Sequence, residues 1–539
     1  MAKAATRIRK SERGYADLRE HIAALERAGL LVRVRREINK DTEMHPLVRW
    51  QYRGGLAEKD WRGFLFENVT DVKGRRYDIP VAVGVMAGSR YVCAVGLDCE
   101  VEGLWEKWER AFRNPIEPVL VKRGPVQEII QKGRDLKQVG GVEQFPIPIS
   151  TPGFDGAPFI TAGHWITRDP ETGIRNVGNY RCHLKAPDRV GIFCSPGQHI
   201  LTHWAKCKEH KVPLDAAIVV GPPPVVSYAA VTKVPYGVDE LAVAGGLAGE
   251  PIQLVKCQTV DLEVPADAEI VIEGHLSTEY MEPEGPFGES HGYMHPRFLS
   301  PFLDISCITR KRNPILVSWT SQVTPSESSV IKRLGYEPLF LRFLKNELGI
   351  KSVVKVAMHE PLTNLRNVVV IQMRKPSDAE AWRALMGAAT FHAGVGKFVV
   401  AVDEDIDPWD LEMVMWAITF RSAPHNDVQI IKGRERWHSP PFRREDRPAE
   451  TREAEDSAML INAILRQPFP PVSLPKKEFM ENARRIWEEL GLPALRPKQP
   501  WFGYSLGDWD AELEEEAQMA LKGEYRRNGE KLKRQRVKA

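Results

Sequence analysis

The chain has 539 residues, of which 43% are hydrophobic and 27% charged, and its formal net charge is only +3. This length exceeds one ordinary hydrophobic core and predicts two or three domains. A charge so close to neutral gives no reason to expect nucleic acid or a membrane surface as the main partner. No stretch approaches the length of a membrane span, and the N-terminus has no apolar signal core, so we expect a cytoplasmic protein.

Residues 1–125 predict an N-terminal α/β domain. Apolar Leu18, Ile22 and Leu25 recur at helical spacing and stop before Gly29, which indicates a helix over residues 15–31. The segments that follow are typical of strands: LVRVRREI, FLFENV and YDIPVAVGVMA.

Residues 126–325 predict a central β-rich domain. It contains the stretch FPIPISTPGFDGAP (145–158), where each proline removes a backbone donor and so prevents regular structure. Short strand-like runs follow: GHWITRD, VGIFCS, DAAIVVG, AEIVIEG, LDISCITRK and PILVSWT. The last two are joined by KRNP, which predicts a hairpin turn. We therefore expect an antiparallel sheet or barrel.

Residues 326–480 predict a C-terminal α/β domain, because strand-like and helix-like segments alternate. EPLFLRFLKNELG (337–349) is typical of a helix. Ser377 and Glu380 have capping-box spacing at the start of another, and Pro408 suits the first position of a third. Residues 481–539 predict a C-terminal helix and a basic, solvated tail.

The cysteines give no sign of a disulfide framework or a zinc ribbon. They are odd in number and scattered, and no two form a CxxC pair. We expect reduced, mostly buried thiols. The seven positions are Cys93, Cys99, Cys182, Cys194, Cys207, Cys257 and Cys307.

The stretch MEPEGPFGESHGYMHP (281–296) places carboxylates among glycines and prolines, which fix the path of a backbone outside helix and sheet. Glu284 and Glu289 are five residues apart. If the loop folds back, both face one pocket, where like charges raise the pKa of one carboxyl as proton transfer near neutral pH requires. The alternative is a surface turn with solvated glutamates, and this stretch alone favours that alternative.

A second stretch, RNVGNYRCHLKAPDRVGIFCSPGQHI (175–200), offers Asn176, Arg181 and His199 at the borders of predicted strands. Asparagine and histidine are possible ligands of a divalent ion, and Glu240 in YGVDELAVAGG could complete the set. An arginine near two glutamates could bind a substrate carboxylate through two hydrogen bonds. For each residue alone, an ion-paired arginine or a satisfied core histidine is the simpler interpretation.

Taken together, these stretches resemble the UbiD-like family of reversible decarboxylases, which use prenylated FMN. The resemblance covers roughly residues 15–470 and depends on several spaced elements. They are EGPFGE, the five-residue step from Asn176 to Arg181, the QH pair that ends at His199, the DE pair in GVDELAVAG, and FHAGVGKFVVAVDEDID.

The resemblance implies an α+β multidomain fold: an N-terminal α/β region, a central split β-barrel related to flavin reductases, and a C-terminal α/β domain. It also implies a catalytic Glu–Arg–Glu network of Arg181, Glu284 and Glu289. In that network Arg181 would orient the substrate carboxylate and keep Glu284 ionised, and Glu289 would give the proton to the carbon that loses CO2.

The resemblance further implies metal ions beside the flavin phosphate. Asn176, His199 and Glu240 would hold manganese or magnesium, since oxygen and imidazole ligands suit such ions. Lys397 would approach the same phosphate, and potassium would bind backbone carbonyls around residues 229–232. The full set of implied cofactor contacts is Asn176, Asn179, Tyr180, Arg181, Gln198, His199, Ala230, Thr232, Glu240 and Lys397.

Two segments depart from the family pattern. Residues 256–259 read KCQT where many relatives have a glutamate, at a position to which we assign no catalytic role. Between Asn176 and Arg181 lies Val-Gly-Asn-Tyr, which is more polar than expected. Asn179 and Tyr180 could therefore alter contacts to the flavin or the substrate.

The expected activity is decarboxylation, or carboxylation in reverse, of an aromatic, heteroaromatic or α,β-unsaturated acid, either free or as a CoA thioester. Expected partners are a flavin prenyltransferase that supplies the cofactor and further copies of the chain in a dimer or hexamer. Two alternatives stay open: a metal-dependent hydrolase built on His199, Glu240 and the pair His291 and His295, and a non-catalytic subunit of a multi-component carboxylase.

Overall fold

A computed structural model describes the chain at residues 15–194, 197–290, 292–295, 297–359, 367–392, 395–434, 456–466, 470–495 and 509–535. These residues form two compact units. The first holds the described residues up to Arg342 and short pieces near 358–368 and 434–456, and the second holds Phe343–Ala357, Val369–Gly433 and the described residues from 457 onward. Within these ranges, no helix is long and apolar enough to cross a bilayer.

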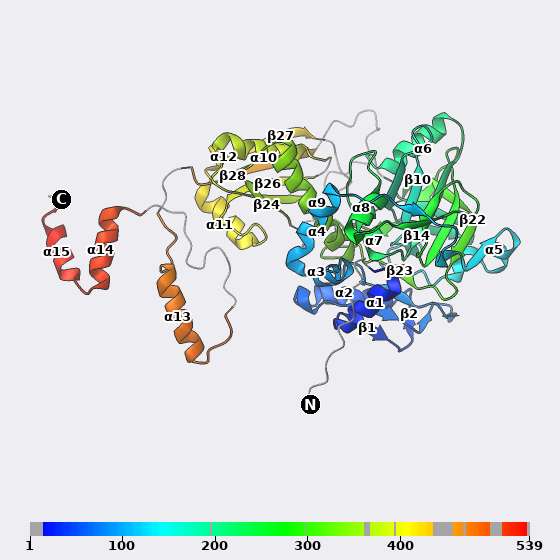
Figure 1. Ribbon diagram of the computed structural model, residues 1–539, viewed down its shortest axis with the longest axis horizontal. Helices are drawn as coiled ribbons and strands as arrows, with labels where there is room; N and C mark the ends of the chain where they lie inside the picture. Colours follow the sequence, from blue (N-terminus) through cyan, green and yellow to red (C-terminus); the bar gives the residue numbers. More distant parts are fainter. Residues whose placement is uncertain are drawn as a thin grey trace. The chain divides into compact units, whose positions relative to one another are not determined.

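The first unit begins with a four-stranded sheet and the helices packed around it (Figure 1). Strand β1 pairs in parallel with β3, β3 pairs antiparallel with β6, and β6 pairs in parallel with β23. The strands are β1 (Leu31–Val34), β3 (Gly63–Phe66), β6 (Val81–Val83) and β23 (Leu316–Ser318). The helices are α1 (Leu18–Arg27), α2 (Met44–Arg53), α3 (Arg90–Gly96) and α4 (Leu104–Arg113).

Helix α1 confirms the helix predicted near the N-terminus. The Asp17 carboxylate accepts hydrogen bonds from the backbone N–H groups of Arg19 and Glu20, which the helix itself leaves unpaired. Leu18 and Leu25 are fully buried, so the predicted apolar face is the face that packs on the core.

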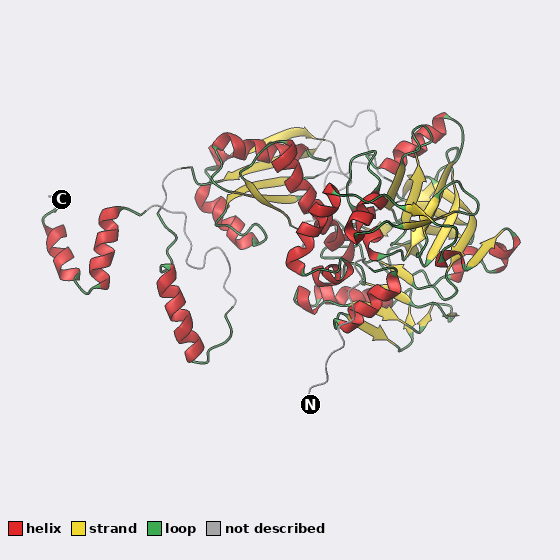
Figure 2. Cartoon of the chain, viewed as in Figure 1, coloured by secondary structure: helices red, strands yellow, loops and turns green. Residues whose placement is uncertain are grey.

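A nine-stranded antiparallel sheet dominates the first unit, in the order β11-β10-β14-β17-β22-β13-β12-β9, with β8 paired to β22. The sheet is strongly curled (Figure 2). The finer prediction of a flavin-reductase-like split barrel stays a prediction. The strands are β8 (Ile129–Lys132), β9 (Phe159–Ile160), β10 (His164–Arg168), β11 (Arg175–Asn179), β12 (Cys182–Ala186), β13 (Arg189–Ile192), β14 (Leu214–Val220), β17 (Ile270–Leu276) and β22 (Phe302–Arg310).

Smaller sheets complete the first unit: β16-β15-β7, β2-β4-β5, β18-β21 and β19-β20. Their strands are β2 (Ile38–Asn39), β4 (Val69–Thr70), β5 (Arg76–Tyr77), β7 (Val119–Leu120), β15 (Gln253–Lys256), β16 (Glu263–Pro265), β18 (Glu282–Glu284), β19 (Phe287–Gly288), β20 (Met294–His295) and β21 (Phe298–Ser300).

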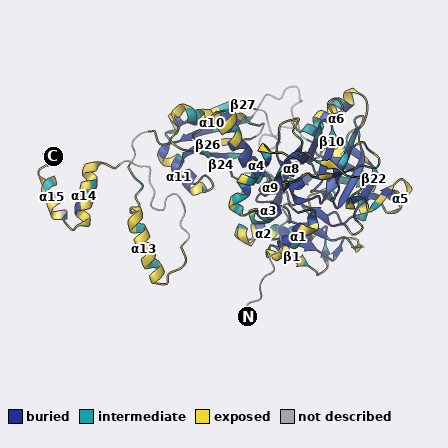
Figure 3. Ribbon diagram, in the orientation of Figure 1, coloured by how far each residue is buried: buried dark blue, intermediate teal, exposed yellow. Residues whose placement is uncertain are grey.

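Three helices lie against the β11 end of the large sheet: α6 (His199–Glu209), α7 (Pro224–Val231) and α8 (Glu240–Ala248). Helices α7 and α8 are almost entirely buried (Figure 3). This burial explains why AVAGGLAG carries small and apolar residues on every side of the helix.

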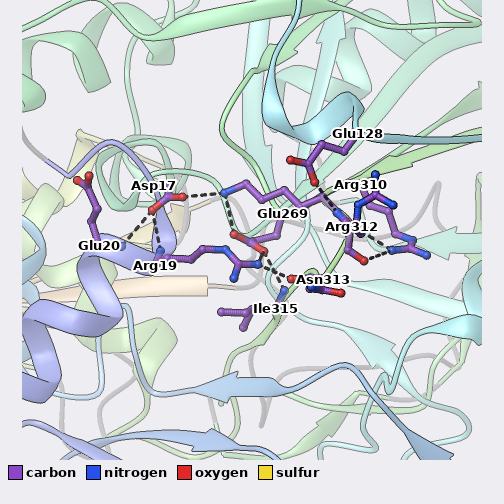
Figure 4. A network of polar contacts seen from close by, with 10 residues as sticks. Asp17, Arg19, Glu20, Glu128, Glu269, Arg310, Arg312, Asn313 and Ile315 are labelled. Carbon is purple, nitrogen blue, oxygen red and sulfur yellow. Dashed lines mark hydrogen bonds and ion pairs between the residues drawn. The ribbon is translucent and has the colours of Figure 1, made fainter.

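The predicted hairpin at KRNP is wrong, because β22 and β23 enter different sheets. A polar network holds the connection instead (Figure 4). Lys311 Nζ lies 2.8 Å from Asp17 Oδ2 and 3.0 Å from Glu269 Oε1. Glu269, which is fully buried, also accepts hydrogen bonds from Arg19 and from the backbone N–H of Ile315. The side chains therefore tie the connection to α1.

The helix predicted at 337–349 begins ten residues earlier, since α9 spans Glu327–Arg342 and a π-helical turn follows over Phe343–Glu347. Its polar first turn is buried, and Glu327 accepts hydrogen bonds from the backbone N–H groups of Gly84 and Met86. A sequence pattern that assigns polar residues to the surface cannot recognise such a start. Pro338 lies inside the helix instead of marking its beginning.

The second unit contains a five-stranded sheet, which agrees with the predicted α/β domain. The Ser377–Glu380 capping box is present at the start of α10, whereas α11 begins at Leu411 because Asp410, not Asp407, caps it. The strands are β24 (Val353–Met358), β25 (Val368–Met373), β26 (Phe398–Asp403), β27 (Val428–Arg434) and β28 (Asp456–Ala463). The helices are α10 (Asp378–Thr390), α11 (Leu411–Arg421), α12 (Pro424–Asp427), α13 (Lys477–Glu489), α14 (Ala511–Leu521) and α15 (Tyr525–Lys533).

All seven cysteines are free thiols, as predicted. The domain bounds predicted at residues 125 and 325 both fall inside the first compact unit, because β23 completes the sheet of β1, β3 and β6.

Candidate active site

A cavity in the first unit gathers ten of the twelve predicted site residues. It is lined by the end of β11, the first turns of α6 and α8, the end of α7 and the loop after β19. Glu284 lies behind the cavity wall and is fully buried. The predicted residues in the lining are Asn176, Asn179, Tyr180, Arg181, Gln198, His199, Ala230, Thr232, Glu240 and Glu289.

Arg181 is the centre of a buried charge network. Its Nε and one terminal nitrogen bind the two oxygens of Glu284 at 2.8 and 2.7 Å, and its other terminal nitrogen contacts Glu289. The guanidinium carbon lies 4.1 Å from the ring centre of Phe193 and 4.7 Å from that of Phe287. Burial alone would lower the pKa of Arg181, but the carboxylates of Glu289 and Glu284 raise it above its usual value.

The backbone of the EGPFGE loop is fixed by side chains from two other segments. His183 on β12 accepts a hydrogen bond through Nδ1 from the backbone N–H of Gly285, at 3.2 Å. Burial lowers the pKa of His183 to about 4, so the ring is neutral and Nδ1 can accept. Asp155 accepts from the backbone N–H of Gly288, also at 3.2 Å. The backbone is thus fixed at Gly285 and Gly288, the residues directly next to Glu284 and Glu289.

Gly288 is required by close packing. A Cβ atom there would lie 2.6 Å from Thr151 Oγ1 and 2.9 Å from Gln322 Cγ, which is closer than carbon atoms approach. The proline-rich segment 145–158 therefore packs directly against the loop. Its Asp155 is half-buried, and burial raises the pKa of that carboxyl to about 6.

The predicted metal ligands Asn176, His199 and Glu240 line the same cavity from β11, α6 and α8. Glu240 is 3% exposed, and its Oε2 accepts one hydrogen bond, from the backbone N–H of Val177 at 2.9 Å. Burial raises the pKa of Glu240 to about 8, and its backbone hydrogen bonds and the charge of Lys233 offset only part of that shift. Burial and Lys233 lower the pKa of His199, so its imidazole is neutral, as metal binding requires.

Among the described residues, no group of three or more His, Cys, Asp or Glu side chains is placed to hold a metal ion. The candidate set has only two members of those types, because its third ligand is an asparagine amide. A buried carboxylate, a neutral imidazole and an amide oxygen fit a hard divalent ion that completes its shell with further oxygen atoms.

The predicted contacts Tyr180, Gln198, Ala230 and Thr232 also line this cavity. Ala230 and Thr232 lie at the end of α7, where the last carbonyls of a helix carry partial negative charge. Gln198 precedes α6, and the Tyr180 ring is 8% exposed. Lys397 directly precedes β26 in the second compact unit, so its role at a flavin phosphate stays a prediction.

Three family models match nearly the whole folded chain. They describe the N-terminal domain (residues 22–112), the Rift-related domain (119–323) and the C-terminal domain (330–450) of 3-octaprenyl-4-hydroxybenzoate carboxy-lyase, UbiD. This protein belongs to the UbiD family. Members of that family are carboxy-lyases, and the resemblance inferred from the sequence is confirmed.

Related proteins match between 77% and 88% of this UbiD chain. An uncharacterized protein of Synechocystis sp. is 30% identical over 77% of this chain and 84% of its own length. The UbiD-class enzyme HmfF of Pelotomaculum thermopropionicum, in complex with prFMN, is 32% identical over 87% of this chain and all of its own, with a TM-score of 0.74. Vanillic acid decarboxylase of Sedimentibacter hydroxybenzoicus is 28% identical over 88% of this chain and 99% of its own, also with a TM-score of 0.74.

Sequence reasoning missed the residues that support this UbiD site. Asp155 lies in a segment that its prolines marked only as irregular. His183 lies in the stretch 175–200 but was given no role, and Phe193 lies in the predicted strand VGIFCS. Trp319, which also lines the cavity, ends the apolar run PILVSWT and was interpreted only as part of a strand. His295 lines the cavity as well, whereas His291 lies outside the described residues.

Proposed function

We propose that this protein is a prenylated-FMN-dependent decarboxylase of an aromatic, heteroaromatic or α,β-unsaturated carboxylic acid, free or as a CoA thioester. One observation carries the proposal. Arg181, held between Glu284 and Glu289, faces a cavity that also presents Asn176, His199 and Glu240. The similarity to HmfF in complex with prFMN supports the same cofactor.

The residues suit the chemistry of CO2 loss. Removing CO2 from such an acid leaves an electron pair that the substrate cannot delocalise, and the bound flavin supplies the electron sink that side chains lack. Arg181 binds and orients the carboxylate of the substrate. Glu289, whose side chain is 23% exposed and lines the cavity, delivers the proton to the carbon. Phe193 and Phe287 cover the guanidinium and exclude water from it.

Glu284 has a different role in this proposal, because its side chain is fully buried and binds Arg181 through both oxygens. It fixes the plane of the guanidinium and so aims the nitrogen that contacts Glu289. Two glutamates of one loop thereby perform two tasks, orientation and proton transfer.

The cofactor phosphate would be anchored through cations. Asn176, His199 and Glu240 would hold manganese or magnesium, and carbonyls near Ala230 and Thr232 would hold potassium at the end of α7. Lys397 would add a positive charge to the same phosphate. The burial of Glu240 in the lining that it shares with Asn176 and His199 supports a cation beside that carboxylate.

We also propose that a flavin prenyltransferase supplies the cofactor and that the chain forms a homo-oligomer. The similar HmfF structure is described as an evolved dimeric form.

The test is to co-express the full chain with a flavin prenyltransferase, then measure the mass and absorbance of the released cofactor, the metal content and CO2 release from a panel of aromatic and unsaturated acids. Glu289→Gln should retain the cofactor but lose CO2 release by at least about a hundredfold, since general acid catalysis contributes that much. His199→Ala should retain less cofactor.

Protein that binds a divalent metal but never flavin would contradict the proposal and favour the metal-dependent hydrolase. Protein that retains prenylated FMN but releases CO2 from no acid in the panel, alone or with a partner subunit, would favour the non-catalytic subunit.

A further inference from the structure

Apart from the amide nitrogen of the candidate metal ligand Asn176, two buried polar atoms of the cavity wall lack a partner in the described part of the chain and lie on residues that contact Thr161. Among the described residues, neither Asn179 Oδ1 nor Trp319 Nε1 makes a hydrogen bond, although both are shielded from solvent. Buried polar groups are nearly always paired, because an unpaired group loses the hydrogen bond that water would have given it. Two such atoms in the lining of one cavity therefore indicate a ligand that pairs with both.

Thr161 contacts both residues, the side chain of Asn179 and the backbone of Trp319. Asn179 Nδ2 donates to the backbone carbonyl of Thr161 at 3.2 Å, and the backbone N–H of Trp319 donates to Thr161 Oγ1 at 2.7 Å. A carbonyl can only accept, so the nitrogen of the Asn179 amide must face Thr161 and its oxygen is left for the ligand. An indole N–H can only donate. The wall thus offers one acceptor and one donor.

The arrangement is already in place without a ligand. Thr161 is 4% exposed, and its hydroxyl lies 3.1 Å from Ser318 Oγ, which lies 2.9 Å from His45 Nε2. Trp319 is 1% exposed and packs on the imidazole of His164, with 5.3 Å between ring centres. A ligand would meet groups that are held by the core, so little side-chain freedom is lost on binding.

The ligand must bring both a donor and an acceptor. The ionised carboxylate of a substrate acid can accept from Trp319 but cannot donate to Asn179, and a metal ion can do neither for the indole. An oxidised flavin ring has a single N–H, which lies between two carbonyl oxygens on the pyrimidine ring. That edge provides the donor and the acceptors together.

We propose that Asn179 Oδ1 accepts a hydrogen bond from this flavin N–H and that Trp319 Nε1 donates one to a carbonyl oxygen of the same ring. The inference rests on the proposed function, because it takes a flavin as the occupant of the cavity. It makes Trp319 a cofactor-binding residue and gives Asn179, a polar residue that departs from the family pattern, a specific partner.

The test measures FMN binding to the flavin-free, full-length protein by the quenching of flavin fluorescence, which requires no substrate. Trp319→Phe removes the N–H and keeps an aromatic ring, and we expect the dissociation constant to rise by about three- to tenfold, the worth of one hydrogen bond. Trp108 offers a matched control. Its Nε1 is also buried without a partner among the described residues, but Trp108 lies on α4 and does not line the cavity. Trp108→Phe should leave FMN affinity unchanged.

The Asn179 contact is tested with N3-methyl-FMN, which lacks the ring N–H. Wild-type protein should prefer FMN to the methylated form, and Asn179→Ala should bind FMN about three- to tenfold more weakly and lose that preference. Circular dichroism of each variant checks that it is folded.

The outcomes separate the two proposals. A wild-type protein that binds no FMN overturns the flavin assignment and this inference with it. FMN binding that is the same in wild type, Trp319→Phe and Asn179→Ala overturns this inference alone. Equal losses in Trp319→Phe and Trp108→Phe would assign the effect to general packing and overturn the role of the indole N–H.

Discussion

At the scale of single residues, the two glutamates that bind Arg181 in the candidate site differ in their access to the cavity. Arg181 carries one positive charge against two carboxylates in direct contact, with Asp155 close enough to act on it electrostatically. Glu284 is enclosed, whereas Glu289 borders the cavity. Only one of the two glutamates can therefore meet a ligand. The five-residue spacing indicated a pair, but which glutamate is buried depends on β12, β18 and the segment 151–156, which no local pattern reveals.

Arg181→Lys tests whether the shape of the guanidinium matters as well as its charge. Lysine keeps the charge but lacks the planar fork that binds both Glu284 oxygens and still reaches Glu289. We expect CO2 release to fall by about a hundredfold or more, because the carboxylate and Glu289 lose their relative orientation. The measurement is the rate of CO2 release per bound flavin, which corrects for cofactor loss.

Arg189→Lys is the matched control for Arg181→Lys. Arg189 also binds two carboxylates, Glu282 and Asp304, but its side chain is 39% exposed and lies outside the cavity lining. The rate of CO2 release per bound flavin in Arg189→Lys should stay near that of wild type. A rate for Arg181→Lys near that of wild type would show that charge alone is enough and would contradict the proposed orientation.

At the scale of elements, periodic segments were predicted correctly and irregular ones were not. The α1 face and the α10 capping box follow from local spacing, and both are present. The start of α9 was missed because Ser326, Glu327 and Ser329 are buried polar residues. Glu327 pairs with the distant backbone N–H of Gly84, and the two serines pair with each other. The end of β22 was misjudged because β23 pairs with β6, more than two hundred residues away.

The polar network behind β23 yields a prediction about stability. Lys311 and Glu269 are 8% and 0% exposed at their side chains, so Lys311→Met removes one of the two cations that contact a buried carboxylate and leaves only the partly exposed Arg19. We expect this change to lower the free energy of unfolding by about 3 kcal/mol. Glu269→Gln in the same chain should recover part of the loss, since the carboxylate that has lost one of its two cations is then replaced by a neutral amide. Chemical denaturation of the flavin-free protein measures the free energy of unfolding of wild type, the two single variants and the double variant, which together form a double-mutant cycle.

An exposed ion pair serves as the control for that cycle. Arg76 and Glu37 are 74% and 51% exposed at their side chains, so Arg76→Met should change stability by no more than about 0.5 kcal/mol. If Lys311→Met were as mild as Arg76→Met, the network of Figure 4 would not hold the connection to α1.

At the scale of the whole molecule, family membership could be predicted from spaced motifs, and so could the gathering of ten site residues in one cavity. The cavity wall itself could not be predicted. Its residues run from Thr161 to Tyr336 and meet only through the nine-stranded sheet and the helices α6 to α9. Lys397 shows the same limit, because a motif gives a position in the chain but not the placement of one compact unit against another.

Buried ionisable groups set how the stability of the first unit depends on pH. His21, His45 and His164 are fully buried, and burial lowers their pKa values to about 4, 3 and 3. Each is neutral in the folded state but titrates near pH 6.5 when unfolded. Between these values the unfolded chain binds more protons, so the stability is complete above pH 6.5 and is lost as the pH falls toward the folded pKa. Glu327 acts in the opposite sense, because burial raises its pKa to about 7.

A single substitution isolates one of these opposing contributions. His45→Gln removes a titrating ring and keeps a side chain that can hydrogen-bond Ser318 Oγ. We compare the free energy of unfolding of wild type with that of this variant. The difference between the two should become smaller as the pH falls below 6.5, by at most about 1.4 kcal/mol per pH unit. Denaturation at pH 7.5, 6.5, 5.5 and 4.5 measures it. If the free energy of unfolding of His45→Gln changed with pH in parallel with that of wild type, the buried ring would not contribute to acid lability.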